Sequence, residues 1–125
     1  MEFTMTKIDL IWVVVSDLNK AVAHYTDVLG FALKEKHDEF GWAELAGKEG
    51  GTRLGLAAAS NENLLKAGQN AVIAISVKDI VRTKENFKKK GVKLIGEIQE
   101  IPHTVKLQSF ADQDGNLFQL AQNLR

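Results

Sequence analysis

The sequence predicts an α+β fold made of two βαβββ modules. The chain has 125 residues, which is enough for one domain. Two β-branched apolar segments, 8–15 and 71–77, each lead into an aspartate, a helical stretch, a glycine and three strand-like segments. One helix covers only one face of a four-stranded sheet, so we expect the two sheets to form a half-open mixed β-barrel with the helices outside.

The first module is expected at about residues 7–59. Segment 8–15 is apolar on both alternating faces, as in a strand that is covered on both sides. Ser16 or Asp17 can cap the next helix by accepting a backbone N–H, and Gly30 can end it in the left-handed conformation. The remaining strands of this module are expected at 31–36, 42–45 and 53–58.

The second module is expected at about residues 70–123 and repeats this order. Asp79 is the helix cap and Gly91 the helix end, with nearly the same spacing as in the first module. A short helix at about 60–69 is expected to link the modules within a single domain, 1–125. The strands of the second module are expected at 71–77, 92–98, 105–110 and 117–121, with a turn at 112–116.

Composition excludes several classes of partner. Lys plus Arg equals Asp plus Glu at 16 each, so no overall field draws the chain to nucleic acid or to an anionic membrane. There is no cysteine for a disulfide framework. The longest apolar run, 10–15, is too short to span a bilayer, and the first residues lack the pattern of a signal peptide. We expect a cytoplasmic protein without nucleic-acid or membrane partners.

Two motifs resemble one known family. Segment 16–31 contains Ser-Asp-Leu and later Ala-His-Tyr-Thr-Asp-Val-Leu-Gly-Phe, and segment 112–120 reads Asp-Gln-Asp-Gly-Asn-Leu-Phe-Gln-Leu. Both are similar to signatures of the glyoxalase/bleomycin-resistance/extradiol-dioxygenase (vicinal oxygen chelate) superfamily, with Gln113 in place of the usual proline. The resemblance covers about residues 7–123 and implies the paired-module fold. It also implies a homodimer, because members commonly pair modules across a dimer interface.

The resemblance further implies where a metal would be held. Metal-using members place ligands on the first and last strand of each module, facing the cavity. A divalent ion needs carboxylate, imidazole or thiolate donors to offset its dehydration. We therefore expect no metal and no other cofactor, although a shift of one residue in register would bring Asp9 to the first position. The four matching positions are Leu10, Gly55, Val72 and Gln119.

Other side chains on the same strand faces complete the expected ligand site. Alternation places Trp12 with Leu10, and Arg53 with Gly55. Trp12 and Trp42 can each stack on a flat ligand or be ordinary packing residues. Arg53 can grip a carboxylate or phosphate, or remain a solvated strand end. The expected ligand-binding residues are Leu10, Trp12, Trp42, Arg53, Gly55, Val72, Ala74 and Gln119.

No catalytic residue is identified outright, and the candidates are His103 and Glu44. His103 follows the single proline and is the best-placed general base among the histidines, because imidazole titrates near neutrality. Glu44 shares a strand face with Trp42. His24 is expected on the helix surface, and His37 in a solvated turn.

The expected function is metal-free binding of a small organic molecule between the modules. Antibiotic-binding members of the resembled family act without catalysis, and those that bind cationic drugs use acidic grooves, which a neutral chain does not suggest. The alternative is an enzyme of that family, a lyase, isomerase or dioxygenase with a non-standard or metal-dependent site. A third possibility is a domain whose own side chains fill the cavity and which acts through a protein partner.

Overall fold

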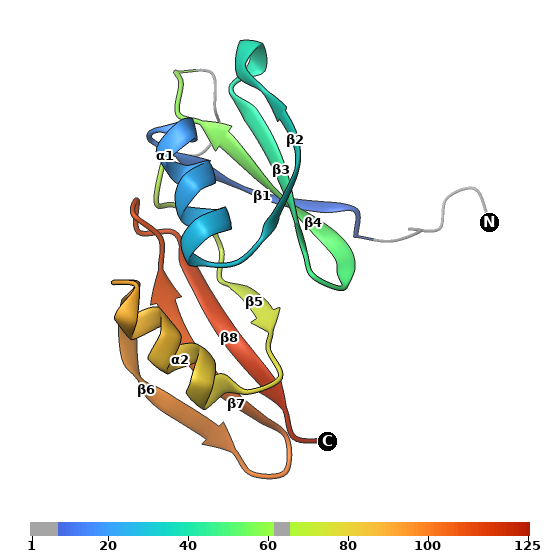
Figure 1. Cartoon of the computed structure of the whole chain (residues 1–125), viewed down its shortest axis with the longest axis vertical. Coiled ribbons are helices and arrows are strands. Elements are labelled where there is room, and N and C mark those ends of the chain that lie inside the picture. Colours follow the sequence, from blue (N-terminus) through green and yellow to red (C-terminus); the bar gives the residue numbers. More distant parts are fainter. Residues whose placement is uncertain (1–7, 62–65) are drawn as a thin grey trace, which may run out of the picture.

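The structure is a computed structural model that describes residues 8–61 and 66–125. It contains two four-stranded mixed sheets, each with helical segments packed on one face (Figure 1). Strand order is β1-β4-β3-β2 in the first sheet and β5-β8-β7-β6 in the second, so the two modules repeat one topology. In each module the first strand runs parallel to the last, and the other pairings are antiparallel. The predicted α+β fold with two βαβββ modules is confirmed.

Module one begins with a strand and a capped helix. The Asp17 side chain accepts the backbone N–H of Lys20 at 3.1 Å, which is the predicted cap. The chain leaves the helical region through Gly30 at φ +89°, as predicted. The elements of module one are β1 (Leu10–Val15), α1 (Leu18–Ala23), η1 (His24–Val28), β2 (Ala32–His37), η2 (Asp38–Phe40), β3 (Trp42–Gly47) and β4 (Gly50–Ala58).

The second half of the first helix is a π-helix, which the sequence did not predict. In η1 the N–H of Leu29 donates to the carbonyl of His24 at 3.0 Å, five residues back. The hydroxyl of Thr26 donates to the carbonyl of Val22 at 2.8 Å. This side-chain bond competes for a carbonyl of the helical ladder and accompanies the widening of the turn.

Module two repeats the pattern with an ordinary α-helix. The Asp79 side chain accepts the N–H of Arg82 at 3.1 Å, and Gly91 has φ +75°. The predicted linker helix at 60–69 falls partly on 62–65, outside the described residues, and the described residues on either side of them form turns. The elements of module two are β5 (Ile73–Ser76), α2 (Ile80–Lys89), β6 (Lys93–Ile101), β7 (Val105–Ala111) and β8 (Leu117–Asn123).

The core lies between the helices and the sheets and is continuous across both modules. Alternate residues of β1 and β4, such as Val13 and Leu56, are fully buried on the side that faces α1. In β8, Phe118 is likewise buried in this core, and its ring stacks on that of Phe110 with ring centres 5.3 Å apart. None of the described helices covers the other side of either sheet, and we call this side the open face.

A buried polar cluster joins the two modules. The hydroxyl of Tyr25 in η1 donates to Asp112 Oδ2 at 2.7 Å, and Asn116 Nδ2 donates to the same oxygen at 2.8 Å. Asn116 Nδ2 also donates to the carbonyl of Val14 in β1 at 2.9 Å. The predicted 112–116 turn is confirmed, with Gly115 at φ +89°. Its polar side chains tie module two to β1 and η1.

Among the described helices, none is long and apolar enough to cross a membrane.

Candidate functional site

The structure places three of the four expected metal-ligand positions in the strands of the open face. Leu10 lies in β1 opposite Arg53, whereas Gly55 lies opposite Trp12. Gln119 lies in β8 opposite Ala74. Val72 falls just before β5 and is 54% exposed.

These positions do not fit a divalent cation. The carboxamide of Gln119 is the only side-chain donor that the four residues offer, and it is a weak one without anionic neighbours. Across residues 8–61 and 66–125, no three His, Asp or Glu side chains are grouped as a metal site requires.

Trp42 occupies the space beside Gly55. A Cβ at position 55 would lie 2.3 Å from Trp42 Cη2 and 3.0 Å from the Cβ of Trp12, so only glycine leaves room for this indole. The rings of Trp12 and Trp42 meet edge to face, with centroids 6.3 Å apart and planes at 65°. The two expected stacking residues therefore form one aromatic corner on the open face of module one.

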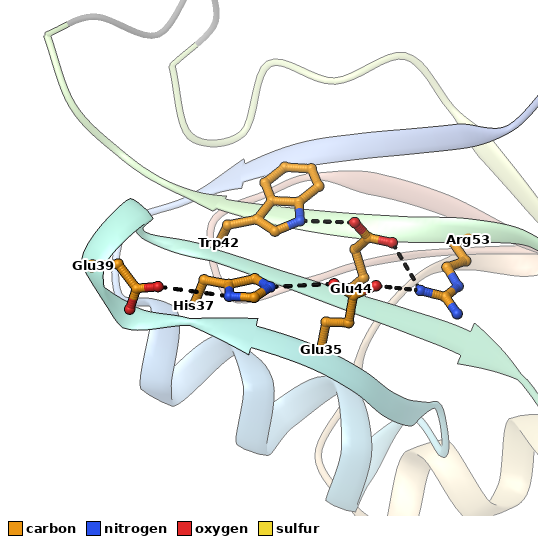
Figure 2. Close-up of polar contacts among 6 residues, drawn as sticks. All are labelled: Glu35, His37, Glu39, Trp42, Glu44 and Arg53. Atoms are coloured by element: carbon orange, nitrogen blue, oxygen red, sulfur yellow. Dashed lines mark hydrogen bonds and ion pairs between the residues drawn. The ribbon is translucent and has the colours of Figure 1, made fainter.

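A chain of charged side chains holds Trp42 in place (Figure 2). The Trp42 Nε1–H donates to Glu44 Oε2 at 3.0 Å. Arg53 Nη1 donates to Glu44 Oε1 at 3.1 Å and to Glu35 Oε2 at 2.8 Å. His37 Nε2 lies 3.2 Å from Glu35 Oε1. Residues of β2, β3 and β4 are thus linked across the open face as His37–Glu35–Arg53–Glu44–Trp42, which we call the polar chain.

The charges of the polar chain stabilise one another. Hydrogen bonds to Glu44 and Glu35 raise the pKa of the Arg53 guanidinium above its ordinary value. The hydrogen bond from His37, followed by that from Arg53, lowers the pKa of the Glu35 carboxyl. His37 also lies 3.7 Å from Glu39 through Nδ1. The arrangement contains more carboxylates than guanidinium groups, although the whole chain is neutral.

Arg53 lies on the open face at the edge of the aromatic corner, as expected from strand alternation. Its Nη1 already bridges two carboxylates, and its side chain is 40% exposed. A ligand carboxylate or phosphate would have to compete with both glutamates for this guanidinium. The geometry favours a structural role for Arg53, which fixes the positions of the Glu44 and Glu35 carboxylates by donating a hydrogen bond to each.

The two candidate catalytic residues are in different modules. Glu44 is half-buried on β3, and each of its oxygens accepts one hydrogen bond. His103 is exposed in the turn between β6 and β7, at the lower end of the molecule in Figure 1. The structure therefore does not join these two residues into one acid–base pair.

Two expectations about the other histidines are wrong. His24 was expected on the helix surface, but its Nε2 is buried, with no hydrogen-bond partner among the described residues. Burial lowers the pKa of His24, and the opposing effect of the Asp112 charge is smaller. His37 was expected in a solvated turn, but it ends β2 and takes part in the polar chain. The period-two spacing of Glu35 and His37 is the sequence signal that would have placed both on one strand face.

The open face of module two is uncharged near the predicted site. Gln119 pairs with Ser109 of β7 and with Ala74 of β5, and its side chain is half-buried. This face can donate and accept hydrogen bonds through amide and hydroxyl groups.

Fold, motifs and sequence comparison together define the class of protein. The chain belongs to the Glyoxalase/Bleomycin resistance protein/Dioxygenase superfamily, whose family model matches residues 7–120. The resemblance first seen at residues 16–31 and 112–120 is confirmed.

Several individual proteins are similar over nearly the whole chain. The uncharacterized protein YetH of Bacillus subtilis (strain 168) is 32% identical over 119 residues, covering 91% of this chain and 96% of that protein. TnmS3, an antibiotic binding protein from Streptomyces sp. CB03234, superposes with a TM-score of 0.84 at 24% identity and covers 97% and 98% of the two chains. A putative glyoxalase family protein from Bacillus anthracis superposes with a TM-score of 0.78 at 20% identity, covering 98% and 99%.

Proposed function

We propose that this protein binds a small, flat organic molecule on its open face, without a metal ion. The observation that carries the proposal is the position of Trp42, which lies over Gly55 and beside Trp12. Two indoles that meet at an angle offer one ring face and one ring edge to a planar guest. The fold similarity to an antibiotic binding protein supports a binding role for this architecture.

The polar chain supports the same role. Because Glu44 and Arg53 are hydrogen bonded to each other and Glu44 accepts the indole N–H, the Trp42 ring is held before a ligand arrives. A side chain that is already fixed loses little conformational freedom on binding. On this proposal Glu44 is a positioning residue, and Gln119 and Ala74 supply the uncharged part of the site.

A second copy of the chain is the proposed cover for the open face. Apolar side chains remain exposed there, among them Val72, Ile95 and Leu117. Exposed apolar side chains on one face of a sheet can be covered by a second subunit, which removes their apolar surface from water. The expected state is a homodimer, and native mass spectrometry measures it directly. A monomer at all concentrations would overturn this part of the proposal.

Tryptophan fluorescence tests the binding proposal, because Trp12 and Trp42 are the only two tryptophans. Neutral planar aromatics such as coumarin and acridine are titrated into the protein. We expect saturable quenching, and a loss of affinity of about tenfold in Trp12→Ala and Trp42→Ala, since an aromatic contact contributes about 0.5–1.5 kcal/mol beyond its buried area. Phe40→Ala is the control, because Phe40 lies in η2, outside the sheet, and is 77% exposed.

Two results would overturn the proposal. Failure of every planar compound to quench either indole would remove the binding role. A stoichiometric divalent ion in the purified protein, with ligand affinity lost in EDTA, would remove the metal-free part and favour the enzyme alternative. For any turnover then found, His103→Ala without loss of rate would exclude His103 as its base.

A further inference from the structure

A hollow lies between the modules, and Arg53, at the edge of the aromatic corner, is one of its lining residues. Its volume is about 600 Å³, within the range of small-molecule sites. It is bounded by the turn that joins β3 to β4 and by six successive residues, Ile73 to Lys78. We call it the inter-module groove. Neither Trp12 nor Trp42 lines it.

The groove lies between two edge strands that are not paired with each other. β1 and β5 are the inner edges of their sheets and do not pair with each other. The end of β1 is tied to module two by the bond from Asn116 to the Val14 carbonyl, and Val13, Val14 and Val15 are buried. Nearer the start of β1 the strand is less buried: Ile11 is 38% exposed and lines the groove.

The inner part of the groove is apolar. Ile11 and Leu54 line it from module one, and Ile73 and Ile75 line it from module two. All four share the strand faces that look towards the helices, because they alternate with Trp12, Gly55 and Ala74 of the open face. A ligand here would lie against hydrocarbon on both sides and along the edge of β5.

The mouth of the groove is cationic. Lys48 lies on the β3–β4 turn and Lys78 follows β5, and both line the groove. Glu49 is the only acidic residue in the lining, and it lies 3.8 Å from Lys78 with both side chains at least 80% exposed. Such an exposed pair contributes little and exchanges readily with another anion. The unpaired edge of β5 adds backbone N–H groups, which favour anions.

We propose that the inter-module groove binds a small amphipathic organic anion: an apolar chain or ring that carries one carboxylate or sulfonate. The apolar body lies against Ile73, Ile75 and Leu54, and the acid group lies between Lys48 and Lys78. The groove shares Arg53 and Ala74 with the open-face site, whereas Trp12 and Trp42 lie outside its lining, so separate variants test the two proposals.

The test uses 1-anilinonaphthalene-8-sulfonate as the fluorescent probe, with octanoate and octylammonium as competitors of equal chain length and opposite charge. We expect a saturable component of probe binding that octanoate displaces and octylammonium does not. Lys48→Glu/Lys78→Glu is expected to weaken probe binding about tenfold, since each surface ion pair contributes up to about 1 kcal/mol and 1.4 kcal/mol is tenfold. Lys88→Glu/Lys89→Glu, with the same change in net charge on the exposed end of α2, is the matched control and is expected to bind normally.

Two variants show where the probe binds: one fills the groove with a larger side chain, and the other removes an indole of the aromatic corner. Ile11→Phe enlarges a 38% exposed side chain that lines the groove on the helix-facing side of β1, and it is expected to abolish probe binding. Trp12→Ala is expected to leave it unchanged. Equal competition by octylammonium, normal affinity in the Lys48/Lys78 variant, or loss of octanoate-sensitive binding in Trp12→Ala with retention in Ile11→Phe would each overturn the proposal.

Discussion

The indole of Trp42 lies across the backbone of Gly55, so that the hydrogen of glycine is the largest group this position accommodates. A methyl group at position 55 would meet Trp42 Cη2 at 2.3 Å and Cζ2 at 2.6 Å. Since Trp42 also donates its N–H to Glu44, any shift of the ring breaks the end of the polar chain. This close contact links β4 to the aromatic corner.

Gly55→Ala should therefore displace Trp42. Overpacking of this kind costs about 1–3 kcal/mol of unfolding free energy, and the released indole should emit at longer wavelength in a Trp12→Phe background. Chemical denaturation and emission spectra measure the two effects. Gly47→Ala is the control, because a Cβ there meets only the Gly50 carbonyl at 3.7 Å. Equal stability of the Gly55 and Gly47 variants would contradict the proposed contact.

Tyr25→Phe should weaken the junction between the modules. It removes the hydroxyl that donates to buried Asp112 at 2.7 Å, and a hydrogen bond to a charged group contributes about 1.5–3 kcal/mol. A double-mutant cycle with Asp112→Asn separates this bond from the other contacts of Asp112. We expect a coupling free energy of about 1 kcal/mol or more. Strict additivity of the two changes would show that the bond contributes nothing.

His24 should make stability depend on pH near neutrality. Its pKa is lowered by burial from 6.5, so the unfolded chain binds a proton at a higher pH than the folded chain does. The free energy of unfolding should therefore fall as the pH falls below about 6.5, down to the folded pKa. In His24→Gln this part of the pH profile should be flat. Urea denaturation at a series of pH values measures it, and an unchanged slope in the variant would assign the dependence to other groups.

His103→Gly should stabilise the protein. His103 has φ +60° and follows Pro102 in a turn closed by the N–H of Thr104 on the carbonyl of Ile101. The left-handed conformation costs a non-glycine residue about 1–2 kcal/mol, partly offset by the greater freedom of glycine when unfolded. We expect a gain of about 0.5–1 kcal/mol in thermal or chemical denaturation. His103→Ala keeps the strain and should show no such gain; equal effects of Gly and Ala would refute this explanation.

The sequence determined most of the fold. β-branched apolar segments, aspartate caps and glycines in the left-handed conformation repeat in order, and these are local signals that depend on a few neighbouring residues. Both caps, Gly30, Gly91 and the 112–116 turn lie where they were predicted. The π-helix at His24–Val28 was missed, because the sequence does not show which helical carbonyl a side chain will take.

The site depended on tertiary structure. Alternation along single strands predicted that Trp42 and Glu44 share a face, and that Arg53 shares one with Gly55. It did not predict that Trp42 would lie over Gly55, or that Arg53 would join Glu35 to Glu44. These contacts run between strands, so they depend on how the strands are paired, in register and in order. The inter-module groove depends further on how the two modules pack against each other, which no local pattern encodes.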